Sequence, residues 1–415
     1  MQQSRLIAAS PIHYGWWILG VGTLGMLMTT PGQTVGVSVF LDPILGDLGL
    51  SRSLASLLYM LGTLGGSLAL PLVGRFIDRR GPRVAVGLIA AAFALACVGM
   101  GLVQGAGTLA LGFIAIRGLG QGALALVSIH TINLWFVRRR GLALSLSGVG
   151  FALAIAIFPL LIEGLIHHLG WRRGYMVLGG AIAATIFPLG VLIFRDPPER
   201  YGLQPDAGLP VASRDRPPAE TNYTLAEARR TLTFWLFTSG NFCVAALGTG
   251  LLFHHYSIMA TSGVAREVAA LVFVPFGLVT AGSNLLSGFL LDRLSPRYLL
   301  ATMLGLLIGA LLLAVHIRQP EWMLVYGVLL GLMQGLNGVL QGGVYAHYFG
   351  RSHLGAISGL ATTLMVAGTA FGPLGFALGF EQFGHYGPTL AGLALFPFLV
   401  AAAALYLEAQ PSQTL

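Results

Sequence analysis

The feature that most constrains this chain is a regular alternation of long apolar runs with short breaks rich in Arg, Pro and Gly. A helix needs about 20 apolar residues to cross a bilayer. Six such runs lie near residues 14–40, 54–75, 84–104, 109–135, 142–166 and 174–194, and six more near 233–259, 267–290, 298–317, 322–348, 355–380 and 388–408. The pattern predicts an all-α polytopic membrane protein with twelve transmembrane helices.

Composition and one polar stretch refine this prediction. Only 9% of the 415 residues are charged, against roughly 25% in soluble domains, and the 58 glycines are typical of membrane helices that approach closely. The stretch 195–231 has clustered prolines and mixed charges, as in a linker. We therefore expect an N-terminal six-helix bundle over 1–194, a cytoplasmic linker over 195–231 and a C-terminal six-helix bundle over 232–415.

The arginines predict the orientation. All 23 basic residues are Arg; 17 of them fall in the loops on the side of the N-terminus and five in the opposite loops. By the positive-inside rule, both termini lie in the cytoplasm and the chain crosses the cell (inner) membrane. The formal charge of +8 is then a topology signal, and no nucleic-acid partner is expected. No cleavage site precedes the first apolar run, so we expect that helix to be retained.

The sequence also contains an internal repeat. Gly74-Arg-Phe-Ile-Asp78-Arg79-Arg-Gly-Pro-Arg83 follows the second run, and Gly288-Phe-Leu-Leu-Asp292-Arg293-Leu-Ser-Pro-Arg297 follows the eighth with the same spacing. Gly118-Leu-Gly-Gln121-Gly122 likewise recurs as Gly331-Leu-Met-Gln334-Gly335. Two parallel repeats of six helices are typical of secondary transporters with a substrate site near the middle of the bilayer.

The paired loop motif, the Arg117-Gly-Leu-Gly-Gln-Gly segment and the 6+6 layout resemble the major facilitator superfamily (MFS) of secondary transporters. The segments His13-Tyr-Gly-Trp-Trp, Gly170-Trp-Arg172 and Pro198-Glu-Arg-Tyr-Gly-Leu-Gln-Pro205 further resemble the bacterial monocarboxylate and oxalate/formate carrier branch. The resemblance implies the MFS fold, transport by alternating access, and a central cavity lined by helices 1, 4, 7 and 10.

The resemblance also implies a gating role for the repeated loop. Its members Gly74, Asp78, Arg79, Arg83, Gly288, Asp292, Arg293 and Arg297 would hold the two halves together at the cytoplasmic mouth in the outward-facing state. The sequence departs from the family pattern in two places. Asn284 and Thr280 occupy the positions where monocarboxylate carriers have a substrate-binding Arg and its partner Asp. Helix 11 lacks the Lys of oxalate carriers. A proton-coupled mechanism through that charge pair is therefore disfavoured.

Arg117 is the only arginine near a helix centre, where an ionisable group is a functional candidate. Its guanidinium could grip a carboxylate through two hydrogen bonds, or it could serve helix packing. Other polar groups share helical stripes or lie on helices expected to line the cavity. The predicted substrate-binding set is Arg117, Gln121, Gln33, Asn241, His255, Asn284, Gln334, Asn337, Gln341 and Tyr345; for each amide the alternative is an interhelical hydrogen bond.

No acidic residue falls at mid-depth in helices 1, 4, 7 or 10, so a coupling proton would have to use a histidine. The candidates are His130, His254, His255 and His347, and His255 is favoured because it shares a helix face with Asn241. Cys97 and Cys243 lie in apolar runs and are expected to be small core residues. The motifs predict no metal site, no cofactor and no nucleotide site.

The sequence therefore predicts a secondary active transporter rather than an enzyme. The favoured substrate is a small organic anion, a mono- or dicarboxylate, and the alternative is a drug-like or neutral metabolite moved outward by an exporter of the same superfamily. The expected partners are the small-molecule substrate, a possible coupling proton and the lipid bilayer, and the chain is expected to be a monomer.

Overall fold

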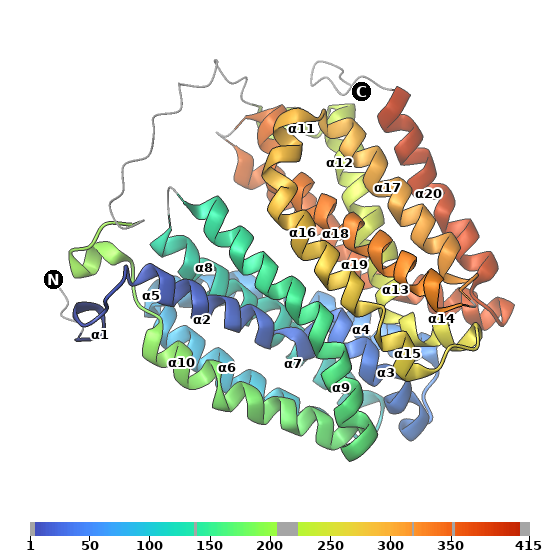
Figure 1. The fold of residues 1–415 in the computed structure, drawn as a ribbon, viewed down its shortest axis with the longest axis horizontal. Coiled ribbons are helices and arrows are strands. Elements are labelled where there is room, and N and C mark those ends of the chain that lie inside the picture. The colour runs from blue at the N-terminus through green and yellow to red at the C-terminus, as the bar shows by residue number, and fades with distance from the viewer. Residues whose placement is uncertain (1–4, 137–138, 206–222, 318, 351–352, 407–415) are drawn as a thin grey trace. The chain divides into compact units, whose positions relative to one another are not determined.

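The computed structural model describes residues 5–136, 139–205, 223–317, 319–350 and 353–406, which form helices and their connections (Figure 1). The chain divides into two compact units. The first comprises Met1–Leu50 and Leu61–Arg214, and the second comprises Ser51–Met60 and Asp215–Leu415. The predicted boundaries at 194 and 232 stay a prediction, since residues 206–222 of the expected linker lie outside the described part.

The first unit consists of helices joined by short turns. Its elements are α1 (Arg5–Ala8), α2 (Gly15–Met28), α3 (Thr34–Leu48), α4 (Arg52–Leu68), α5 (Leu70–Arg80), α6 (Pro82–Met100), α7 (Ala106–Ile116), α8 (Ala125–Trp135), α9 (Arg140–Ala184) and α10 (Ile186–Ile193). A 3₁₀ turn at Thr30–Gly32 separates α2 from α3, a π-helical segment at Arg117–Leu124 joins α7 to α8, and another 3₁₀ turn covers Pro198–Tyr201.

The second unit follows the same plan. Its elements are α11 (Leu225–Ala228), α12 (Leu232–Cys243), α13 (Thr249–Phe253), α14 (His255–Thr261), α15 (Arg266–Ala270), α16 (Phe273–Arg293), α17 (Pro296–Ala314), α18 (Pro320–Phe349), α19 (Leu354–Phe383) and α20 (Gly387–Tyr406). A π-helical segment at Val244–Gly248 joins α12 to α13. The start of α4 also belongs here: the backbone N–H of Ser53 donates to Glu381 Oε1 at 3.1 Å, and the Tyr59 and Phe253 rings lie 4.5 Å apart.

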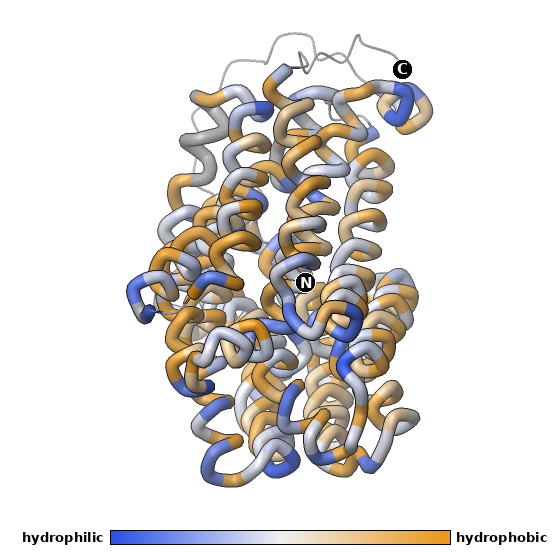
Figure 2. Tube along the Cα trace, turned by 90° about the vertical axis from the view of Figure 1, so that its right-hand side faces the viewer, coloured by the Kyte–Doolittle hydropathy of each residue, from blue (hydrophilic) through white to orange (hydrophobic). Residues whose placement is uncertain are grey.

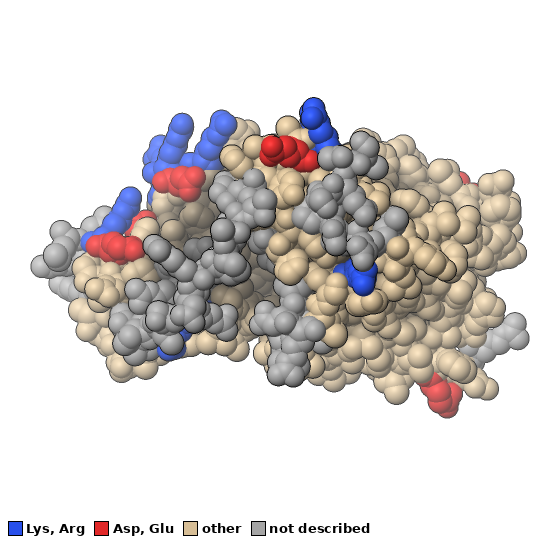
Figure 3. Space-filling model, turned by 90° about the horizontal axis from the view of Figure 1, so that it is seen from above, with Lys and Arg blue, Asp and Glu red and all other residues tan. Residues whose placement is uncertain are grey.

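Every predicted apolar run coincides with helical residues, which confirms the all-α membrane fold. In the described part of the chain, nine helices are long and apolar enough to cross a membrane, and one of these, Gly141–Ile193, covers two predicted runs. Gly170 separates those two runs with a φ of 76°, as expected for its turn. In Figure 2 hydrophobic residues dominate the helices, and most of the surface visible in Figure 3 is uncharged. The count of twelve stays a prediction.

Glycines determine how closely the helices approach. Gly327, Gly331 and Gly335 recur every fourth residue along α18, and a Cβ on any of them would lie within 2.7 Å of an atom of α16. In the first unit a Cβ on Gly66 would lie 2.7 Å from the backbone N of Gly118. Small residues at such spacing allow close van der Waals packing where lipid gives helices no hydrophobic reason to associate. The glycine segments thus serve packing, as the sequence predicted.

The tyrosine of the His13-Tyr-Gly-Trp-Trp segment anchors the start of the first span. The Tyr14 hydroxyl donates to the carbonyl of Ile193 at 2.8 Å, and its ring lies 5.3 Å from that of Trp135. These contacts join the beginning of α2 to the ends of α8 and α10. A motif that resembles a transporter branch therefore has a packing role in this unit.

A capping box begins the short helix α11. Glu227 N–H donates to Thr224 Oγ1 at 3.3 Å, and the Thr224 backbone N–H donates to the Glu227 carboxylate at 2.8 Å. The hydrogen bonds from Thr224 lower the pKa of Glu227. Cys97 and Cys243 are both buried and free, which confirms that they are small core residues.

We predict that Gly335→Ala destabilises the second unit. Its Cβ would lie 2.0 Å from Ser283 Cβ, so α16 and α18 must separate, and overpacking of this kind costs about 1–3 kcal/mol. The apparent unfolding midpoint of the purified protein should fall by several degrees. Gly305→Ala is the matched control, because nothing lies within 4 Å of its Cβ; equal midpoints for the two variants would show that the close approach is not required.

Candidate functional site

A polar cluster lies within the second unit, where α12 meets α18. Thr238 Oγ1 and the Tyr345 hydroxyl share a hydrogen bond of 3.1 Å, and Asn241 Nδ2 donates to the same hydroxyl at 3.3 Å. All three residues are buried. Because Thr238 and Asn241 are three residues apart on α12, they present their side chains to Tyr345 together. The structure thus brings together two of the predicted site residues, and it adds Thr238.

A small cavity of about 50 Å³ adjoins this cluster. It is lined by Asn241, Gln341, Tyr345, Ser358, Ala361, Thr362 and Met365. Gln341 Nε2 also donates to Asn337 Oδ1 at 3.0 Å, one helical turn earlier on α18. The volume gives room for a few water molecules or one small polar group. Its polar lining consists entirely of neutral groups that can both donate and accept hydrogen bonds.

Sequence analysis missed the contribution of α19 to this cavity. Ser358, Thr362 and Met365 lie at i, i+4 and i+7, which places them on one helix face. Their spacing was visible in the sequence, but hydroxyls are common on membrane helices, where they can bond to their own backbone. Gln334 lies two turns before Gln341 on α18 and does not line this cavity.

In the first unit, Arg117 stabilises a break in the first span. Its side chain is only 3% exposed. Arg117 Nε donates to Thr63 Oγ1 at 3.0 Å, and Nη1 donates to the carbonyl of Gly32 at 3.0 Å. Gly32 ends the 3₁₀ turn that interrupts the helix, where carbonyls lose their helical partners. The packing role considered for Arg117 is therefore visible in the structure; a substrate contact stays a prediction.

The two other predicted side chains of this unit lie on the same irregular segments. Gln33, which follows the 3₁₀ turn, donates from Nε2 to Thr29 Oγ1 at 3.1 Å. Gln121 lies within the π-helical segment that begins at Arg117, and its buried Oε1 has no donor among the described residues. Segments of π-helix are frequent at functional sites. Gln33, Gln121 and Arg117 thus all lie where the backbone departs from a regular helix.

His255 lies apart from the cavity. It follows Asn241 by fourteen residues, which is about 21 Å along a helix. Its Nε2 is 2.9 Å from the carbonyl of Ala269, and its ring stacks on Tyr326 with centroids 6.1 Å apart. The adjacent His254 instead contacts the carbonyl of Pro373 at 2.8 Å. The structure does not bring His255 and Asn241 together, so a coupling role for His255 stays a prediction.

Asn284 and Thr280 lie on α16 at its interface with α18. Thr280 Oγ1 donates to the carbonyl of Phe276 at 2.7 Å and lies 3.5 Å from that of Gly331. A Cβ on Gly338 would lie 3.6 Å from Asn284 Oδ1. Both side chains therefore lie at the interface made by the α18 glycines.

The first copy of the gating motif covers the end of α5 and the start of α6. Asp78 Oδ1 is 4.0 Å from His130 Nε2, Arg83 Nε donates to the carbonyl of Val191 at 2.8 Å, and Gly81 turns the chain with a φ of 78°. Gly74 lies on α5 with nothing within 4 Å of its Cβ position. These contacts fix the loop on α8 and α10.

The second copy of the motif is only partly described. Arg297 Nη2 donates to the Tyr298 hydroxyl at 3.1 Å. The side chains of Asp292 and Arg293, and Gly288 with them, lie outside the described part of the structure. In the described part of the chain, no three His, Cys, Asp or Glu residues lie close enough together to hold a metal ion.

Comparison with known families decides the class of protein. The model of the Major Facilitator Superfamily matches residues 19–373 and 242–414. The chain belongs to the major facilitator superfamily. Members of this family are transporters rather than enzymes, and they move small molecules across membranes. The chain is therefore a multi-pass membrane transporter.

The similar proteins include carboxylate carriers. The chain is 23% identical to the oxalate:formate antiporter of Oxalobacter formigenes over 72% of its own length and 68% of the antiporter's. It is 29% identical to human monocarboxylate transporter 11, over 63% of this chain and 55% of that protein. A bacterial homologue of the human lysosomal transporter Spinster has the same fold, with a TM-score of 0.69, 18% identity and 97% coverage of both chains.

We predict that Asp78→Asn favours opening toward the cytoplasm. A cysteine at Thr362, in a variant with Cys97→Ala and Cys243→Ala, reports access to the cavity. In the gating role, Asp78 contributes a contact of about 1 kcal/mol to the state whose cytoplasmic mouth is closed, and its loss changes the equilibrium between closed and open mouth about fivefold. An impermeant maleimide should therefore label that cysteine several-fold faster in inside-out vesicles. His130→Gln should act in the same direction, and His385→Gln, on an exposed turn, is the control. Unchanged labelling in Asp78→Asn would contradict the gating role.

Proposed function

We propose that this chain is a secondary active transporter of a small organic anion, a mono- or dicarboxylate, and that it works by alternating access. The observation that carries the proposal is the cavity lined by Asn241, Gln341 and Tyr345, with Ser358 and Thr362 added from α19. Its size suits one polar group of a substrate. The carboxylate assignment is supported by the similarity to the oxalate:formate antiporter and the monocarboxylate transporters.

The charge that a carboxylate requires comes from Arg117 in this proposal. A carboxylate that leaves water must recover its hydration through charge-assisted hydrogen bonds. Arg117 is buried at the π-helical segment, next to Gln121 and the broken first span. Gln33, Asn337 and Gln334 would add neutral donors, and Asn284 and His255 complete the proposed set. In this proposal Arg117 donates hydrogen bonds both to the carbonyl of Gly32 and to the substrate.

Export of a drug-like or neutral metabolite is the second candidate. It is favoured by one observation, the wholly neutral polar lining of the cavity in the second unit. The two candidates differ in what they require of the substrate. A carboxylate carrier should reject the uncharged amide of its own substrate, whereas a carrier of neutral molecules should not.

The proposed orientation has both termini in the cytoplasm and the chain in the cell (inner) membrane as a monomer. It is supported by the 17 arginines that the sequence places on one side, against five on the other. Coupling to a proton requires a group that titrates during transport, and His255 is the proposed residue. The loop motif of Gly74, Asp78, Arg79 and Arg83, with its copy at Gly288, Asp292, Arg293 and Arg297, is the proposed gate.

We predict that carboxylates stabilise the purified protein and that the matching amides do not. A ligand at 100 times its Kd adds about 2.7 kcal/mol to stability. The unfolding midpoint should therefore rise by several degrees with at least one of formate, acetate, oxalate or lactate, and not with formamide, acetamide, oxamide or lactamide. Gln341→Leu should reduce the rise and Gly305→Ala should not. Equal stabilisation by an acid and its amide would favour the neutral exporter.

We predict that Arg117→Gln weakens carboxylate binding by about 2–4 kcal/mol, the range for losing one partner of a buried charge pair. Arg117→Lys should restore part of the affinity, because it keeps the charge but loses the fork. Thr63→Val is the control, because it removes the acceptor of Arg117 Nε and leaves the guanidinium group in place. If Thr63→Val and Arg117→Gln weaken binding equally in folded protein, Arg117 acts on packing alone.

A further inference from the structure

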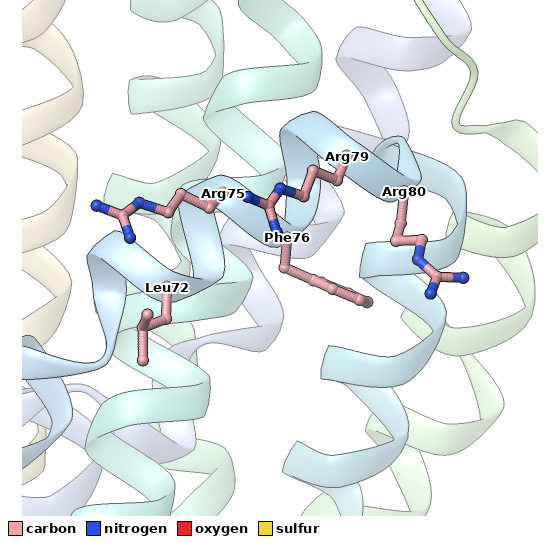
Figure 4. Close-up of a pocket in the computed structure, with 5 residues that line it drawn as sticks. All are labelled: Leu72, Arg75, Phe76, Arg79 and Arg80. Carbon is pink, nitrogen blue, oxygen red and sulfur yellow. The ribbon is translucent and has the colours of Figure 1, made fainter.

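A hollow on an exposed face of α5 shares no lining residue with the proposed substrate site. It has a volume of about 370 Å³ and is lined by Leu72, Arg75, Phe76, Arg79 and Arg80 (Figure 4). These residues lie at i, i+3, i+4, i+7 and i+8, so they share one face of the helix. Ile77, which is buried, faces the other way and holds α5 against its own unit. The face combines three cationic side chains with two apolar ones.

The three arginines of this face have no acidic partner in the described part of the chain. Ion pairs in that part include those of Asp47 with Arg172, Asp196 with Arg200, and Asp78 with His130. Asp78 belongs to the same helix, but its contact is with His130 on α8. Three exposed guanidinium groups within two helical turns repel one another, and an anion placed among them relieves that repulsion.

The apolar part of the face lies toward the interior of the span. Leu68 is 78% exposed and Leu72 is 64% exposed, and both precede the arginines on a membrane-length stretch that runs from Arg52 to Arg80. From Leu72 to Arg80 the helix rises about 12 Å. The surface thus changes from apolar to cationic toward the helix end, where long arginine side chains reach the membrane surface.

We infer that this face binds the phosphate headgroup of an acidic phospholipid. Arg75, Arg79 and Arg80 hold the phosphate, and Leu72 and Phe76 contact the glycerol and the start of an acyl chain. Clustered arginines next to a membrane helix are attracted to anionic lipids, and arginine matches the geometry of phosphate. A soluble anion would gain nothing from the exposed leucines, which is why a lipid is the occupant that fits both parts of the face.

The test compares short-chain lipids on the purified full-length chain. Binding of dihexanoylphosphatidylglycerol, dihexanoylphosphatidylcholine and inorganic phosphate is measured by microscale thermophoresis in detergent. We expect phosphatidylglycerol to bind more tightly than the other two. The variant Arg75→Gln/Arg80→Gln, which leaves the proposed gating residues intact, should weaken that binding about thirtyfold and leave binding of phosphatidylcholine unchanged.

Matched variants separate a site from an overall charge effect. Arg229→Gln/Arg230→Gln removes the same charge from two exposed arginines elsewhere and should bind phosphatidylglycerol like the parent. Arg75→Lys/Arg80→Lys, checked for folding by gel filtration, should bind at least half as well, because the charges remain. Loss of binding in the Arg229/Arg230 control, or equal losses in the folded Lys and Gln variants, would overturn the proposal.

Two other ligands of the α5 face, a soluble anion and acidic residues of the chain itself, would give different binding results. If inorganic phosphate binds as tightly as phosphatidylglycerol, the face is a site for soluble anions and the lipid proposal is wrong. If phosphatidylglycerol binds only after Asp206, Asp215 and Glu220 are neutralised, acidic residues of the chain occupy the face, and the proposal is again wrong. Carboxylate binding, measured on the same variants, tests the substrate proposal independently, because no residue altered here belongs to that set.

Discussion

The first unit depends on one hydrogen-bonded contact, the bond from Arg117 to the carbonyl of Gly32. A helix that breaks inside a membrane exposes carbonyls that water cannot reach, and each unsatisfied group costs several kcal/mol. The 3₁₀ turn at Thr30–Gly32 creates this situation, and the Arg117 guanidinium resolves it while it also donates to Thr63. A Cβ on Gly32 would lie 2.2 Å from the carbonyl oxygen of Ile116, so glycine is needed for the contact to form. One side chain thereby joins three apolar runs.

The second unit meets a similar demand without a charge. Its first run also departs from regular helix near its middle, through the π-helical segment Val244–Gly248. Here α19 packs directly against this segment. A Cβ on Gly372 of α19 would lie 1.9 Å from the carbonyl oxygen of Ala246. Thr238 and Asn241, one to two turns earlier, bond to the Tyr345 hydroxyl. The irregular backbone of the second unit is therefore approached closely by a glycine of α19, and neutral hydrogen bonds join the preceding turns of α12 to α18.

The sequence predicted the elements that local physical chemistry determines. The helical runs, the break between two of them at Gly170 and the close approach of glycine-containing helices follow from apolar length, backbone freedom and small side chains, and each is found in the structure. The break at Thr30–Gly32 was not predicted. Its only sequence signal is Pro31, and proline is also tolerated in membrane helices that continue through it. Thr238, Ser358 and Thr362 were missed because a hydroxyl on a membrane helix becomes a site residue only through a neighbour far away in sequence.

The same limit explains why a helix face shared by His255 and Asn241 does not bring the two side chains together. A helical wheel records the direction of a side chain but not its height, and fourteen residues bring the chain to almost the same direction about four turns further along. Height is supplied by the contacts, which enclose His255 between Ala269 and Tyr326. Sequence stripes are therefore most informative for members about one turn apart, as for Gln341 with Asn337 and with Tyr345.

The chemistry of arginine explains why position 117, near the centre of its apolar run, carries this side chain. Its counterpart by spacing is Leu330, so the second half does without a charge at that position. A guanidinium has five N–H donors in a rigid plane, whereas an ammonium presents three from a single point. With Nε directed to Thr63 and Nη1 to Gly32, the bonds leave in two directions from one flat group. A planar guanidinium group can donate to the carbonyl of the interrupted helix and still has N–H groups left to donate to a carboxylate. The packing role and the proposed substrate role of Arg117 therefore require the same chemistry.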